Sequence, residues 1–263
     1  MEASQDFYLA VPSRHNPQLQ QLVSLVNQDA ELVQLWKCAN VNAVDRAGFS
    51  DHGPVHVRIT ANAALRLLRL LVNAGIQPGV VLNYGLTAGD AEVVVVLACC
   101  VHDLGIAISR DDHERHSLIL AYPKARQLLT ALYPEPTATI LTAEVLHAVI
   151  SHHWDARPLT LEAGVVKVAD ALDMSEGRSR IPFQAGEVNI HSLSAQAIES
   201  VQIGPGTDRP VRLDIVMSNS AGIFQVDELL KRKLDHSTLA PYVEVVARIR
   251  RDGEAGPVEV YRH

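Results

Sequence analysis

The doublet His102-Asp103 closes the most hydrophobic stretch of the sequence, residues 91–101. An imidazole or a carboxylate left without a partner in an apolar interior costs several kcal/mol or is neutralised, so the pair needs a partner. Consecutive helical residues point about 100° apart, which lets a histidine and an aspartate in tandem straddle one cation. The alternative for a doublet standing alone is a histidine hydrogen-bonded to the neighbouring acid.

Other residues that could complete a cation site occur on both sides of this doublet. They are His52, His56, His113, His116, His152, His153 and Asp170. Nitrogen and carboxylate ligands together suit Fe, Mn, Zn, Ni or Co. The recurrence of these residue types favours a bound divalent transition metal over an isolated His-Asp pair.

The composition is that of a globular protein with a sizeable core. With 263 residues, 48% of them hydrophobic, the chain fits one large domain or one domain with a small appendage. A net charge of −7 argues against a protein whose main task is to bind nucleic acid. The three cysteines form no disulfide or zinc pattern, the N-terminus lacks the order of a signal peptide, and the longest apolar run is too short for a membrane span. We therefore expect a cytoplasmic protein that does not contact a membrane.

Helical spacing of apolar residues predicts the elements that position the histidines. Helices are expected from Asn16-Pro17, from Pro54 to Gly75, from an N-cap at Asp90 to His102, from His113, from Thr137 to His152, and over Glu162 to Met174. Prolines 123, 134 and 136 are expected to punctuate the region between the helix at His113 and the helix that begins at Thr137.

From about Phe183 the pattern changes to alternation, which predicts strands at residues 211–217 and 243–249. Between them, a helix over residues 226–234 has one apolar side, formed by Val226, Leu229, Leu230 and Leu234. The predicted fold is mainly α, with an all-helical body over 1–182 and a small α+β domain over 183–263. We expect the second domain to serve association or substrate selection, with an unpaired strand at 258–261 able to extend a sheet across a homo-oligomer. A self-contained cap is the alternative.

The order His56, His102-Asp103, Asp170 resembles the H…HD…D signature of the HD superfamily of metal-dependent phosphohydrolases. Residues 51–56, 101–105 and 168–173 resemble its opening, central and closing motifs, and the likeness covers roughly residues 50 to 180. The resemblance implies a helical metal-binding domain that hydrolyses phosphate esters.

The same resemblance implies a ligand set, carried over residue by residue. A first divalent metal would be bound by His56, His102, Asp103 and Asp170. The extra histidines are similar to those of the two-metal subset, so His113, His152 and His153 would bind a second ion, with Asp103 shared. His116 is expected to be a surface helix residue, and the role of His52 stays open.

The sequence departs from a standard HD-GYP phosphodiesterase of cyclic dinucleotides. That group has a lysine shortly after the doublet and a Gly-Tyr-Pro run after the paired histidines, whereas this chain has Leu104-Gly105-Ile106-Ala107 and Trp154-Asp155-Ala156-Arg157-Pro158. The resemblance therefore points to the two-metal subset without assigning this substrate.

The expected chemistry is hydrolysis of a phosphomonoester or phosphodiester, of a nucleotide or a similar small molecule, by a metal-bound hydroxide. Asp103 would bridge the ions, while Lys167, one helical turn before Asp170, and Arg178 or Arg180 could hold a phosphate. Solvated surface charge is the alternative for these cations. A catalytically silent metal- and nucleotide-binding regulatory protein is the alternative function, and the complete set of expected ligands favours the enzyme.

Overall fold

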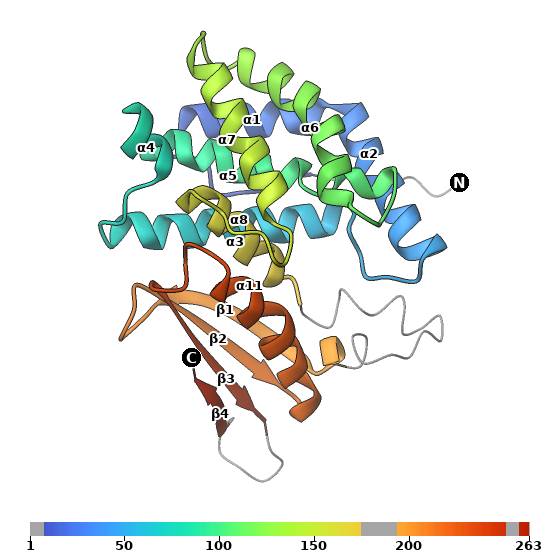
Figure 1. Cartoon of the computed structure of the whole chain (residues 1–263), viewed down its shortest axis with the longest axis vertical. Helices are drawn as coiled ribbons and strands as arrows, with labels where there is room; N and C mark the ends of the chain where they lie inside the picture. Colours follow the sequence, from blue (N-terminus) through green and yellow to red (C-terminus); the bar gives the residue numbers. More distant parts are fainter. Residues whose placement is uncertain (1–7, 175–193, 251–257, 263) are drawn as a thin grey trace.

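The computed structural model describes residues 8–174 and 194–250 with their side chains, and residues 258–262 as backbone. A helical body carries a small sheet at one end (Figure 1). The body contains α1 (Pro17–Gln28), α2 (Ala30–Asn40), η1 (Val41–Arg46), α3 (Pro54–Asn73), α4 (Gly79–Tyr84), α5 (Ala88–Val101), η2 (Leu104–Ala107), α6 (His113–Thr130), α7 (Thr137–Ser151) and α8 (Leu161–Ala171). The mainly α fold class is confirmed, while α2 and α4 are elements that the sequence reading did not include.

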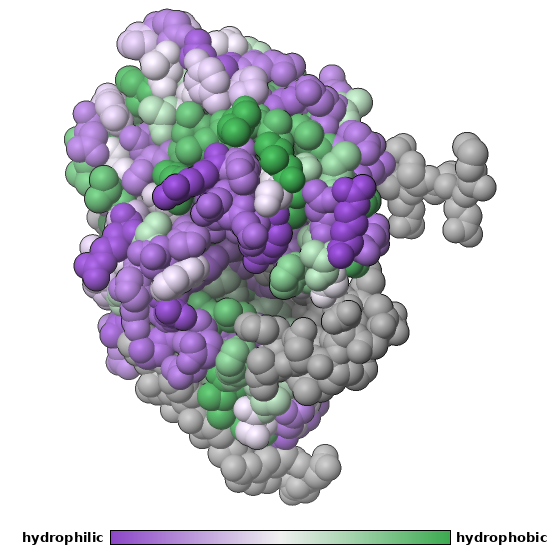
Figure 2. Space-filling model, turned by 45° about the vertical axis from the view of Figure 1, so that its right-hand side comes forward, coloured by the Kyte–Doolittle hydropathy of each residue, from purple (hydrophilic) through white to green (hydrophobic). Residues whose placement is uncertain are grey.

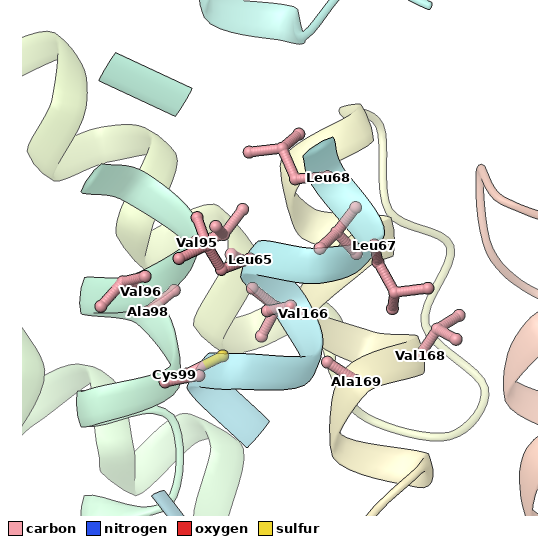
Figure 3. Close-up of a cluster of buried hydrophobic side chains, with 14 of the residues drawn as sticks. Leu65, Leu67, Leu68, Val95, Val96, Ala98, Cys99, Val166, Val168 and Ala169 are labelled. Atoms are coloured by element: carbon pink, nitrogen blue, oxygen red, sulfur yellow. The ribbon is translucent and has the colours of Figure 1, made fainter. Parts of the chain in front are cut away.

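Helix α5 is the centre of the core. It is apolar on all sides and every residue from Val93 to Val101 is buried, as expected for a helix surrounded by others. Its side chains meet those of α3 and α8, including Val95 and Cys99 from α5 and Leu65 from α3 (Figure 3). The first set of candidate metal ligands lies at the ends of these three helices.

Two local predictions about the helices are wrong. Thr87, not Asp90, is the N-cap of α5: Asp90 lies three residues later and accepts a hydrogen bond from the Thr87 backbone N–H at 2.9 Å, which completes a capping box. Pro123 does not end the helix that begins at His113 but lies inside it, in α6. The residue one turn earlier, Ile119, is 64% exposed, so water can solvate the carbonyl that loses its partner.

The C-terminal unit is a four-stranded sheet with a helical crossover. Its strands β1 (Ile198–Pro205), β2 (Val211–Met217), β3 (Val243–Ile249) and β4 (Val258–Arg262) lie in the order β1-β2-β3-β4. Only the central pair, β2 and β3, is parallel, and it is joined through η3 (Ser220–Gly222), η4 (Gln225–Lys231) and α11 (Arg232–Asp235). The strands predicted at 211–217 and 243–249 are confirmed, and β1 was missed. The last strand is paired with β3 rather than unpaired.

The sheet and the crossover pack directly against the helical body. Helix α3 contacts β1 and β2, and α11 contacts α8. The Thr238 hydroxyl donates to the Thr160 carbonyl at 3.1 Å, and a side chain at Gly164 would collide with Thr238. The predicted boundary between residues 182 and 183 lies outside the described residues and stays a prediction.

On the face drawn in Figure 2, hydrophilic side chains predominate and apolar ones occur in smaller groups between them. None of the described helices combines the length and the apolar character that crossing a bilayer requires.

Candidate metal centre

The buried ends of three packed helices bring the first set of predicted ligands together. His102 and Asp103 follow the last residue of α5, His56 lies in the first turn of α3, and Asp170 is near the end of α8. Because α5 packs against both α3 and α8, residues separated by as much as 114 positions meet at one point.

The donor atoms of this first set converge. The Nε2 atoms of His56 and His102 lie 3.3 Å and 3.2 Å from Oδ2 of Asp103. His56 Nε2 is also 3.3 Å from Oδ1 of Asp170. All four donor atoms lie within 4.8 Å of one another, the spacing at which one ion can be shared.

A second set faces the other oxygen of Asp103. Oδ1 lies 3.3 Å from Nε2 of His113 and 3.5 Å from Nε2 of His152. The first turn of α6, which carries His113, approaches closely because Gly105 has no side chain: a Cβ there would collide with the α6 backbone at His113 and Ser117. The two oxygens of Asp103 thus connect the two sets.

Three of the four rings hold their outer nitrogen on a hydrogen-bond acceptor, as metal-binding histidines do. These Nδ1 contacts are Asp173 Oδ2 at 2.6 Å for His56, Cys99 O at 2.9 Å for His102 and Val149 O at 2.6 Å for His152. Nδ1 of His113 lies 3.1 Å from the carbonyl oxygen of Arg110 and 2.9 Å from Nη1 of the same arginine. A ring that donates through Nδ1 presents a bare Nε2 to the centre. The facing Nε2 atoms of His56 and His102 lie 3.2 Å apart, a spacing at which they share a proton in the metal-free protein or could both bind one metal ion.

The comparisons agree with this geometry. Residues 59–175 match the HD domain family. The chain is 41% identical over 216 residues to the uncharacterized protein MJ1020 of Methanocaldococcus jannaschii, a match covering 82% of this chain and 83% of that protein. The chain belongs to the HD domain family. The family match begins at residue 59, just after His56, so the position of His56 in this HD domain rests on the structure.

Electrostatics keep the carboxylates of the HD site ionised. Burial would lower the pKa of His102, but the charges and hydrogen bonds of Asp103 and Asp170 outweigh it and raise the pKa to about 9. Burial would raise the pKa of Asp103, yet its histidine neighbours hold it well below its usual range. The pKa of His152 is lowered, chiefly by burial, which favours the neutral ring that a metal ligand requires.

The structure does not bring His153 into either donor set. Its Nδ1 contacts the carboxylate of Asp155, and its side chain is 37% exposed, whereas His152 is buried. Adjacent residues at the end of α7 point in different directions, so only one of the tandem pair faces Asp103. His153 and His52 line the cavity into which the two donor sets open. His116 belongs to neither donor set.

The structure places one of the predicted phosphate-binding cations, Lys167, away from the cavity. Lys167 is fully buried, and its ammonium donates to the carbonyl of Ala156 rather than lining the cavity. Burial, assisted by the charge of Lys233, lowers the pKa of Lys167 to about 8. Arg178 and Arg180 lie outside the described residues.

The two donor sets open into a cavity of about 560 Å³. Its walls include Arg110 and Lys233, two cations that the sequence reading did not select. Arg110 lies three residues before His113 and could have been found from that spacing. Lys233 comes from the C-terminal unit, 63 residues after Asp170, and no local pattern connects the two.

Proposed function

We propose that this protein is a metal-dependent phosphohydrolase that cleaves a phosphomonoester or phosphodiester of a small molecule, most simply a nucleotide. The observation that carries the proposal is Asp103, whose two oxygens face two histidine sets at the floor of an open cavity. A carboxylate shared in this way suits two neighbouring cations that act on one substrate. We propose Fe, Mn, Zn, Ni or Co as the cofactor, from the mixed nitrogen and oxygen donors.

The charge of the cavity wall supports a metal requirement. The acidic residues among those described in the wall are Asp103, Asp111, Asp112, Glu114, Asp170 and Asp173, and the lysines and arginines are Arg110 and Lys233. Such a wall repels a phosphate by itself. Bound divalent ions would offset this charge, activate water for attack at phosphorus and stabilise the leaving oxygen.

Arg110 is placed to orient the phosphate. Its guanidinium lies 5.3 Å from the centre of the Phe49 ring, close to the second donor set. Its Nη1 lies 2.9 Å from Nδ1 of His113, and its Nε is buried without a hydrogen-bond partner among the described residues. The other terminal nitrogen of this planar guanidinium would donate to a phosphate oxygen.

The outer part of the cavity suits an aromatic group such as a nucleobase. Phe49 and Trp154 line it and are 47% and 45% exposed. Exposed aromatic rings can stack against a base, and about 560 Å³ lies within the range of small-molecule sites. We also propose that the protein acts in the cytoplasm, a compartment that suits the buried thiols of Cys99 and Cys100. We further propose that the chain associates into a homo-oligomer.

Phosphate release from purified protein tests the proposed function. The protein is stripped with a chelator, reloaded separately with Mn, Fe, Zn, Ni or Co, and incubated with nucleoside monophosphates, cyclic mononucleotides, dinucleotides and sugar phosphates. We expect at least one metal to restore hydrolysis, and Asp103→Asn to abolish it. A correctly folded, metal-loaded protein that hydrolyses none of these esters would support the regulatory alternative instead.

A further inference from the structure

The C-terminal unit contributes a charged side chain to the cavity beside the metal ligands. Lys233, in α11, pairs with Oδ2 of Asp170, and its side chain is only 18% exposed. Gln225 and Leu229 from the preceding η4 line the same cavity. One wall of the candidate active site is therefore built by the crossover between β2 and β3.

Asp170 links this lysine to the first donor set. Its Oδ1 lies 3.3 Å from Nε2 of His56 and 3.7 Å from Nε2 of His102. Its Oδ2 faces the opposite way, towards Lys233. The ammonium therefore lies where the first set opens into the cavity, while the guanidinium of Arg110 lies beside the second set, with Nη1 2.9 Å from Nδ1 of His113.

The segment that carries Lys233 is fixed on both sides. The guanidinium of Arg232 lies 4.0 Å from the centre of the Trp154 ring, in the loop after α7. Thr238 donates to the carbonyl of Thr160 at 3.1 Å, at the start of α8. A lysine on an anchored segment loses less conformational freedom on binding an anion than a lysine on a free surface.

The charge of Lys233 acts beyond its ion pair with Asp170. After burial, this charge is the next largest cause of the lowered pKa of Lys167, against which Asp155 acts in the opposite direction. Lys233 and Arg110 are the lysine and arginine residues that line the cavity within the described part of the chain. Lys233 is thus a source of positive potential in a mainly acidic wall.

We propose that Lys233 binds an oxygen of the substrate phosphate on the Asp170 side of the centre, so that the C-terminal unit helps to select phosphate esters. The identity of the anion rests on the proposed function. The phosphate lies between this ammonium and the guanidinium of Arg110, with its oxygens facing both. The phosphate-binding lysine is then Lys233 and not the buried Lys167, which was predicted from the sequence.

Binding of inorganic phosphate to the manganese-loaded protein tests this role without requiring turnover. Isothermal titration calorimetry compares the wild type with Lys233→Met and Lys233→Arg. Lys231→Met is the matched control, because Lys231 lies on the same segment and pairs with Asp235. Manganese content is measured for each variant by mass spectrometry, and folding is measured by circular dichroism. Lys233→Gln replaces the methionine variant if that variant does not fold.

We expect Lys233→Met to keep the wild-type manganese content and to bind phosphate about tenfold more weakly or worse, since it loses a charge-assisted hydrogen bond. Lys233→Arg and Lys231→Met should stay within about threefold of the wild type, because each retains the cavity charge. Unchanged phosphate affinity in Lys233→Met, or loss of manganese together with phosphate, would overturn the inference, as would a wild type that binds no phosphate. If the wild type binds phosphate but hydrolyses no ester, the proposed function fails while the comparison of variants still decides the role of Lys233.

Discussion

The Nδ1 atom of His56 lies 2.6 Å from Oδ2 of Asp173, and both side chains are buried. This contact fixes the ring so that its other nitrogen, Nε2, faces Asp103 and Asp170. Asp173 is outside both donor sets, yet it determines how one of their members is presented. Carboxylates in this position orient a metal-binding imidazole and increase its basicity.

We therefore predict that Asp173→Ala weakens metal binding about 10- to 100-fold without removing a ligand. Competition with a chromophoric chelator measures the change in affinity. Asp155→Ala is the control, because Asp155 also contacts a histidine Nδ1 but does so at His153, outside the donor sets. Equal metal affinity in the two variants would mean that the His56 ring needs no support from Asp173.

The tandem histidines should differ in their effect on metal content. His152 is buried with Nε2 facing Asp103, whereas His153 contacts Asp155. We predict that His152→Ala lowers the number of bound ions per chain by about one and that His153→Ala leaves it unchanged. Mass spectrometry of the loaded proteins measures both numbers. A loss of metal in His153→Ala alone would restore the ligand assignment made from the sequence.

The central and closing motifs of the site could be predicted from the sequence because each lies at the end of an apolar helix. His102 and Asp103 close α5, and Asp170 closes α8. The direction of a ring at a helix end depends on neighbouring elements, so the tandem pair after α7 gave no signal that His152 and His153 diverge. Lys233 could not be found because its position depends on how the C-terminal unit packs on the body, which no local spacing encodes.

Metal binding should release a proton near neutral pH. Burial opposes protonation of His102, but Asp103 and Asp170 raise its pKa to about 9, so the metal-free protein holds this proton at pH 7. A metal ligand must be unprotonated. We predict that the apparent metal affinity rises as the pH increases from 6 towards about 9, because fewer molecules then carry the proton. The proton and the metal ion compete for His102, and this competition determines both the direction and the size of the change in metal affinity with pH.

Calorimetry in buffers of different ionisation enthalpy measures this release. At pH 7 the apparent enthalpy of manganese binding should depend on the buffer with a slope of about one proton per first ion bound. The slope should fall towards zero as the pH passes about 9, where His102 is already unprotonated. A slope of zero at pH 7 would contradict the protonated state of the metal-free site.

The last prediction concerns the glycine that lets α6 reach Asp103. A Cβ at Gly105 would collide with the α6 backbone at His113 and Ser117, while the Gly105 N–H donates to the Ser117 hydroxyl at 2.8 Å. Helix α6 can only relieve the collision by moving away, which withdraws His113 from the shared carboxylate. We predict that Gly105→Ala lowers the free energy of unfolding by about 2–3 kcal/mol, as measured by urea denaturation.

The same variant should keep the first donor set, because His56, His102 and Asp170 come from helices that do not depend on α6 for their contact. Metal content should therefore fall by about one ion per chain and not to zero. Gly204→Ala is the matched control, since a Cβ there has open space around it and should change neither quantity measurably. A Gly105→Ala protein with wild-type stability and full metal content would show that α6 can be displaced without losing His113 from the centre.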